Sequence, residues 1–189
     1  LPNGIGQLTS STSYVGSTPG HDGAAYVESA ASINTLGQVT SQTLSIPSTA
    51  PAFANTSLTT NMSYNADGSV ATVTDPAEGG LAQEVVRSTY DAVGNLAGLS
   101  GTSAYATATY TPLSQVAEIN RNSTSGTSLN SSYGWDAATG RLNQIQNTTV
   151  TGATAAVATN NAYTYDAAGD VLSIAQTSDS LQSEIQCLI

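Results

Sequence analysis

The chain has 189 residues, of which 13 are Asp or Glu and 3 are Arg, and it contains no Lys. Its formal net charge is -10, and 8% of the residues are charged, against roughly 25% in an ordinary soluble domain. This composition argues against a nucleic-acid-binding protein, which needs Lys and Arg clusters to neutralise phosphates, and against attraction to anionic lipids. No window approaches the roughly 20 consecutive apolar residues of a membrane-spanning helix.

Counting residues also limits the possible chemistry. Cys187 is the single cysteine, which excludes a disulfide framework or a multi-cysteine zinc site within this chain. Its apolar neighbours predict a buried side chain. His21 is the single histidine, and it stands in the loop-like segment 17–23 without a marked nucleophile, so we expect a solvated loop residue. We therefore predict no catalytic, cofactor-binding or metal-binding residues.

A seven-residue motif, with one extra residue in one copy, recurs along the chain. It consists of an aromatic residue, an Asp or Asn, two variable residues, a Gly, one further residue and an apolar residue. We call the whole segment a corner. Its first residue occupies the aromatic position, and its Gly occupies the glycine position. The aromatic positions are spaced by 20 to 31 residues, and we interpret 3–8, with Gly6, as the remnant of a seventh copy. In chain order, the six corners are 33–39, 64–70, 90–96, 110–116, 135–142 and 165–171.

Each corner has the chemistry of a tight turn between two strands. An Asp or Asn side chain can bond the backbone two residues further on, and Gly adopts positive φ without steric cost. Two copies depart from the pattern, because Ile33 replaces the aromatic residue and Ser114 replaces the Gly. The residues that we expect to form these structural turns are Tyr64, Gly68, Tyr90, Asp91, Gly94, Trp135, Asp136, Gly140, Tyr165, Asp166 and Gly169.

The residues between the corners predict strands and loops. Runs rich in Val, Thr and Tyr, such as 85–90 and 106–110, favour strands that lead into a corner. Clusters of Gly, Ser, Thr and Asn at 122–126 and 147–154 predict loops. Apolar residues fall two and five places after the glycine position in five of the six corners, the exception being Gln42. A spacing of three breaks strand alternation, so it indicates either a bulge after the turn or partial burial of both faces.

The copies at 90–96 and 165–171 resemble the Tyr-Asp-x-x-Gly-Arg/Asn-Leu motif of the YD-repeat, or rearrangement-hotspot (RHS), family. This family comprises large secreted bacterial proteins, with the teneurins as animal relatives. The resemblance extends over the whole chain and implies an all-β fold. Consecutive antiparallel β-hairpin repeats would form a curved, spiralling sheet that is part of a YD-repeat shell or barrel. Residues 1–189 would be one repeat array within a longer shell.

The resemblance implies a structural segment without enzymatic activity or cofactor. Its shell would enclose a C-terminal toxin in a secreted bacterial protein, so the partners would be the remainder of the shell and the toxin. We expect a secreted or cell-surface location, with no nucleic acid and no membrane insertion by this segment. An alternative is a surface adhesin or carbohydrate-binding module, in which Trp135 and the repeated Tyr residues stack on a glycan. A glycosidase that uses Asp166 and Asp170, or Asp75 and Glu78, is less well supported.

Overall fold

The computed structural model describes residues 1–16, 23–50, 52–123, 126–178 and 184–187. Every regular element in this part of the chain is a β-strand, and the strands are antiparallel and follow one another in the sheet in chain order. The expectation of an all-β protein built of consecutive antiparallel hairpins is therefore confirmed. The strands are β1 (Ser10–Val15), β2 (Ala24–Ile33), β3 (Val39–Ser45), β4 (Ser57–Tyr64), β5 (Val70–Asp75), β6 (Glu84–Tyr90), β7 (Leu96–Ser100), β8 (Ala104–Tyr110), β9 (Val116–Arg121), β10 (Thr127–Trp135), β11 (Leu142–Thr151), β12 (Thr154–Tyr165), β13 (Val171–Ser178) and β14 (Glu184–Cys187).

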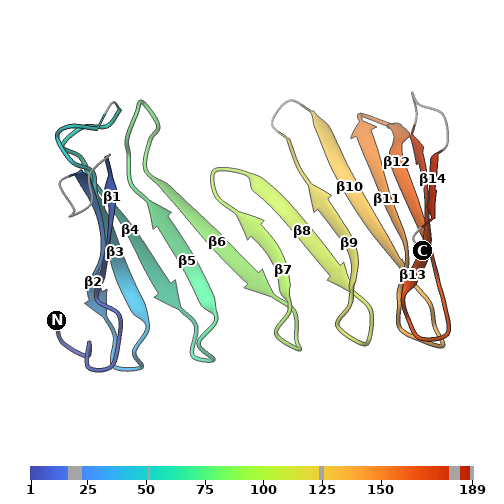
Figure 1. Cartoon of the computed structure of the whole chain (residues 1–189), viewed down its shortest axis with the longest axis horizontal. Helices are drawn as coiled ribbons and strands as arrows, with labels where there is room; N and C mark the ends of the chain where they lie inside the picture. Colours follow the sequence, from blue (N-terminus) through green and yellow to red (C-terminus); the bar gives the residue numbers. More distant parts are fainter. Residues whose placement is uncertain (17–22, 51, 124–125, 179–183, 188–189) are drawn as a thin grey trace. The chain divides into compact units, whose positions relative to one another are not determined.

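The chain divides into two compact units, Leu1–Ser88 and Thr89–Ile189. In the first unit, β1 to β5 pair in succession. The corners 33–39 and 64–70 join β2 to β3 and β4 to β5, and they lie at the same end of these strands (Figure 1). The connection between β3 and β4 and the one after β5 lie at the opposite end. Each corner is thus the tight turn of one hairpin.

The second unit repeats this arrangement from β7 to β14. Its strands also pair in succession, and its corners join β8 to β9, β10 to β11 and β12 to β13. The prediction of a loop at 147–154 is wrong. Strand β11 continues to Thr151 and β12 starts at Thr154, with Val150 opposite Ala155. The Thr and Val residues of this segment have high β-propensity, and this outweighs the local abundance of Asn and Gly.

The structure decides between the two explanations for the three-residue apolar spacing. Tyr64 lies opposite Val70 and Met62 lies opposite Val73, while Ala71 is an extra residue in a β-bulge. Since Met62 and Tyr64 are two residues apart on one strand, Val70 and Val73 lie on that same face, which we call the aromatic face. The bulge explanation is therefore correct. Register shifts also occur at the aromatic positions Ile33, Tyr110, Trp135 and Tyr165.

The sheet has little buried core. Among the described residues, Ile33 and Ala50 are the buried apolar residues, and no large side chain is completely buried. The prediction of a buried Cys187 is wrong, because this residue is exposed in β14. Strand β14 has β13 as its partner on one side, and the described elements include no second layer that could cover its side chains. They also include no helix that could cross a membrane.

Candidate functional site

The six corners share one backbone geometry. In corner 90–96, the Asp91 amide donates to the Asn95 carbonyl over 2.9 Å and the Gly94 amide donates to the Asp91 carbonyl over 3.1 Å. The equivalent pair of bonds closes the corners that begin at Ile33, Tyr64, Tyr110, Trp135 and Tyr165. The Asp91 carboxylate adds the expected side-chain bonds, because Oδ1 accepts from the amides of Val93, over 3.0 Å, and Asn95, over 2.9 Å. The repeat motif thus encodes one recurring turn.

The glycine position has positive φ in every corner. The six values are 77° at Gly37, 89° at Gly68, 92° at Gly94, 58° at Ser114, 68° at Gly140 and 105° at Gly169. Ser114 adopts this left-handed conformation although it carries a Cβ, which is sterically disfavoured. The geometry is therefore a requirement of the corner and is kept even where the sequence departs from Gly.

The side-chain acceptor of the turn varies between corners. Thr111 takes the place of Asp, and its hydroxyl accepts from the amides of Leu113 and Gln115 at 3.3 Å each, longer than at Asp91. In corner 64–70 the acceptor is Asp67, which takes bonds from the amide and hydroxyl of Ser69 at 2.9 and 2.6 Å. A hydroxyl oxygen can thus replace a carboxylate oxygen as the acceptor without loss of the turn.

Hydrogen bonds hold the corner carboxylates in the ionised form. The side-chain bond from Asn95 lowers the pKa of Asp91 below its ordinary value, and the side-chain bond from Thr139 does the same to the pKa of Asp136. The backbone amides of Asp170 and Gly169 lower the pKa of Asp166. The hydroxyl and amide of Ser69 lower the pKa of Asp67. A low pKa is the opposite of what a general acid needs at neutral pH, so these groups suit a turn better than catalysis.

A first ladder of hydrogen bonds links four of the corners to the corner before them. The aromatic residue donates to the carbonyl of the residue that stands two places after the preceding glycine position. Tyr110 Oη donates to the Leu96 carbonyl over 2.8 Å, and Tyr165 Oη donates to the Leu142 carbonyl over 2.6 Å. Trp135 Nε1 donates to the Val116 carbonyl over 2.8 Å, and in the first unit Tyr64 Oη donates to the Val39 carbonyl over 2.6 Å.

A second ladder runs in the other direction, from the residue after the glycine position to the next corner. Gln38 Nε2 donates to the Gly68 carbonyl over 3.1 Å, and Gln115 Nε2 donates to the Gly140 carbonyl over 2.8 Å. Arg141 Nη1 donates to the Asp166 carbonyl over 3.0 Å, and its guanidinium carbon lies 5.6 Å from the centre of the Tyr165 ring. We did not predict these residues, although a Gln, Asn or Arg recurs at this place in four of the six corners.

The structure places the predicted turn residues in the same roles throughout. Tyr64, Tyr90, Trp135 and Tyr165 each end a strand, and the Asp and Gly residues form the turns that follow. Asp166 and Asp170 belong to one turn, in which the Asp170 amide donates to Asp166 Oδ1 over 2.9 Å. His21 lies outside the described residues. Among those described, no group of three His, Cys, Asp or Glu side chains is close enough to hold a metal ion.

The fold and its linked corners define a β-hairpin repeat protein. No protein-family model matches the sequence, and no curated relative matches it. Solved structures do match: two crystal structures, of TcdB2-TccC3 and of TcdB2-TccC3-Cdc42, each give a TM-score of 0.65 at 22% identity, covering 92% of this chain. A Tc holotoxin pore from Photorhabdus luminescens gives 0.64 at 21% identity.

The similarity establishes the fold of the chain. The shared fold agrees with the expectation of an array of antiparallel hairpins. This chain spans 9% of the length of the chains that it matches.

Proposed function

We propose that this chain is a non-catalytic structural segment of an RHS/YD-repeat shell that encloses a C-terminal toxin in a secreted bacterial protein. Its partners would be the remainder of that shell and the enclosed toxin domain. The proposal is supported by the fold of the Tc toxin structures and by the distribution of side-chain bonds. In four corners, the polar group of the aromatic residue donates to a backbone carbonyl of the neighbouring corner.

The two ladders carry this proposal. The aromatic side chains of four corners bond backward, and the Gln, Asn or Arg after the glycine position of four corners bonds forward. Neighbouring hairpins within a unit are thus joined by side chains as well as by strand pairing. Repeat proteins are stabilised by such nearest-neighbour interfaces, because a single repeat cannot bury a core. A continuous, internally bonded sheet is suited to serve as a wall.

The experiment is limited proteolysis of the complete gene product. We expect the enclosed domain to resist a protease concentration that digests the same domain expressed alone. Trp135→Ala removes the donor to the Val116 carbonyl and should accelerate cleavage of the enclosed domain several-fold. Tyr14→Ala, which changes an exposed aromatic residue of β1 outside the corners, is the matched control. Equal cleavage of the enclosed and the isolated domain would exclude a protective shell.

The alternative function, a surface adhesin or carbohydrate-binding module, predicts a different result. It requires Trp135 or the corner Tyr residues to offer a ring and a polar group to a sugar. Since Trp135 Nε1 and three corner Tyr hydroxyls already donate to backbone carbonyls, we expect no signal from the 189-residue chain on a glycan array. A specific signal that is lost in Trp135→Ala would favour the adhesin.

A further inference from the structure

The first unit contains an apolar groove that the repeat ladders do not explain. Its volume is about 510 Å³, and all its lining residues belong to β2 to β5 or to the connections that follow β3 and β5. We call this cavity the acidic groove. The apolar residues that line it are Leu44, Leu58, Met62, Phe53, Pro76 and Leu81.

The floor of the acidic groove is the aromatic face of the sheet. Leu44 lies directly opposite Leu58 across the β3–β4 pair, and Glu28 lies opposite Leu44 across the β2–β3 pair. Met62 lies two residues before Tyr64 on β4, so it has the same orientation as the corner aromatic. Because strand spacing fixes these side chains in adjacent rows, the floor is a preformed strip that fits an extended segment better than a compact ligand.

Two connections form the walls, and one of them is strained. Phe53 lies between β3 and β4 with a φ of 54°, a conformation that is rare for a bulky side chain. Its Cε1 lies 3.1 Å from the point where a Cβ on Gly79 would stand, so the ring packs closely against this residue, whose φ of 62° favours Gly. Phe53 is nevertheless 51% exposed and Leu81 is 77% exposed. The backbone thus holds apolar side chains at the mouth of the groove, although burial of these side chains would be favourable.

The charges around the groove have one sign. Glu28, Asp75 and Glu78 line it, and its lining includes no Arg. Asp75 also stands directly opposite Glu84 across the β5–β6 pair, which places two like charges on neighbouring strands. The single Arg of residues 1–88, Arg87, lies opposite Thr72, whose side chain points to the other face from Val73.

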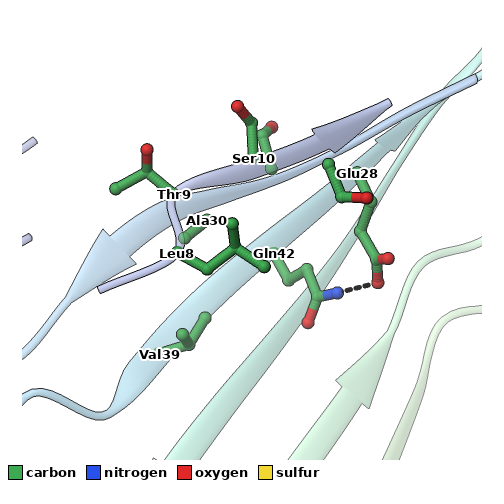
Figure 2. Close-up of a pocket in the computed structure, with 9 residues that line it drawn as sticks. Leu8, Thr9, Ser10, Glu28, Ala30, Val39 and Gln42 are labelled. Carbon is green, nitrogen blue, oxygen red and sulfur yellow. Dashed lines mark hydrogen bonds between the residues drawn. The ribbon is translucent and has the colours of Figure 1, made fainter. Parts of the chain in front are cut away.

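The polar end of the groove contains Gln42, the one exception to the pattern of apolar residues that follows each glycine position. Gln42 stands five places after Gly37, where the other corners carry an apolar residue, and Gln42 Nε2 donates to Glu28 Oε1. Figure 2 shows this bond beside Leu8 and Val39, in a neighbouring pocket of about 180 Å³ that Glu28 and Gln42 also line. The bond fixes the Glu28 carboxylate at the edge of the acidic groove, where it can face a cation.

We infer that the acidic groove binds an extended polypeptide segment in which Lys or Arg alternates with large apolar side chains. The apolar side chains would lie on Leu44 and Leu58, between Phe53 and Leu81. The cations would face Glu28, Asp75 and Glu78. The charge of the rim and the apolar floor together select this chemistry against an acidic or a purely polar segment. This inference does not depend on the shell proposal, because it rests on the residues that line the groove and not on the ladders or on the similarity to the Tc toxin structures.

The test is a binding titration of the 189-residue chain with capped octapeptides. One peptide alternates Lys with Leu, a second alternates Glu with Leu, and a third alternates Lys with Ser. We expect saturable binding of the first peptide at low ionic strength and at least tenfold weaker binding of the other two. Glu78→Gln and Asp75→Asn should each weaken binding of the first peptide about threefold, as removal of a rim charge does. Added salt should reduce the differences.

Two control variants have the same chemistry elsewhere in the chain. Asp170→Asn removes one exposed carboxylate in the second unit and should leave the dissociation constant unchanged. Leu81→Ser should weaken binding about fivefold, whereas Leu113→Ser, at a leucine that is also 77% exposed, should not. The inference is overturned if the first peptide does not bind, if the three peptides bind equally, or if the control variants weaken binding as much as the groove variants. Thermal unfolding of each variant verifies that it is folded.

Discussion

The two units solve the same structural problem on the aromatic face in different ways. In the second unit, a row of polar side chains crosses four strands. Arg121 Nη1 donates to Ser131 Oγ over 2.8 Å, Ser131 Oγ donates to Asn147 Oδ1 over 2.6 Å, and Asn147 Nδ2 donates to Thr159 Oγ1 over 2.9 Å. In the first unit, Leu44 and Leu58 stand near the ends of β3 and β4 that lie away from the corners, and they line the acidic groove.

The difference concerns how the side chains on the aromatic face are covered in a sheet with little core. The polar row of the second unit is satisfied within the chain, and Ser131 is only 3% exposed. The leucines of the first unit have no comparable cover from the described residues, since Leu44 is 37% exposed and Leu81 is 77% exposed. The corners join each repeat to its neighbours, whereas the residues farther from the corners are free to specialise.

The largest effect should come from the corners, which both units share. Gly68→Val in the first unit and Gly94→Val in the second should each lower the free energy of unfolding by about 1–3 kcal/mol, because both positions have positive φ. The space beside Gly94 is open, so its loss would measure backbone strain alone. Chemical denaturation gives both values. Unchanged stability in both variants would show that the corner does not require left-handed geometry.

The second prediction compares the polar row of the second unit with the acidic groove of the first. Asn147→Ala should cost about 2 kcal/mol, because it leaves the buried Ser131 hydroxyl without its acceptor and Thr159 without its donor. Leu81→Ser, in the acidic groove, should change stability by less than about 0.5 kcal/mol because the side chain is largely exposed. Denaturant midpoints distinguish the two. A cost for Leu81→Ser equal to that for Asn147→Ala would mean that the groove is part of the folding core.

The correct prediction of the corners and the errors made elsewhere in the chain both have a physical explanation. Turn chemistry is local, so the residues 90–96 and 165–171 were sufficient to predict where strands end and begin. The segment 147–154 was wrongly predicted as a loop because its role depends on pairing with β12 and on Asn147 bonding across strands. The acidic groove was not predicted at all, since Phe53 and Leu81 stand in irregular connections whose path no periodicity describes.

The third prediction tests the corner that departs from the repeat pattern. Ser114→Gly should raise the free energy of unfolding by about 0.5–1 kcal/mol, since it removes a Cβ from a left-handed position. Ser114 Oγ also accepts a bond from Asn95 Nδ2 at 3.2 Å, and the loss of this bond limits the gain. Ser45→Gly, in β3, is the matched control and should lower stability by a similar amount. Destabilisation by Ser114→Gly would show that the ladder bond outweighs the strain.

The smallest effect should be a dependence on acid that differs between the units. The four carboxyls whose hydrogen bonds lower their pKa are Asp67 in the first unit and Asp91, Asp136 and Asp166 in the second. A pKa that is lower in the folded chain than in the unfolded chain, where it is about 3.9, stabilises the fold above the unfolded value. This stabilisation is lost as the pH falls through the folded pKa. Below about pH 4, the protection of backbone amides against hydrogen exchange, relative to the unfolded chain at the same pH, should therefore fall more in the second unit.

A variant isolates one of these carboxyls. Asp91→Asn keeps Oδ1 as an acceptor for the amides of Val93 and Asn95, so the turn should persist at pH 7. Because the amide of the variant does not titrate, the melting temperature should fall less steeply between pH 5 and pH 3 than in the parent chain. Identical slopes for the two chains would mean that the Asp91 carboxylate contributes no acid sensitivity. The corner would then be held by its backbone bonds, and the charge of the acid would be dispensable, as Thr111 already indicates at the equivalent position.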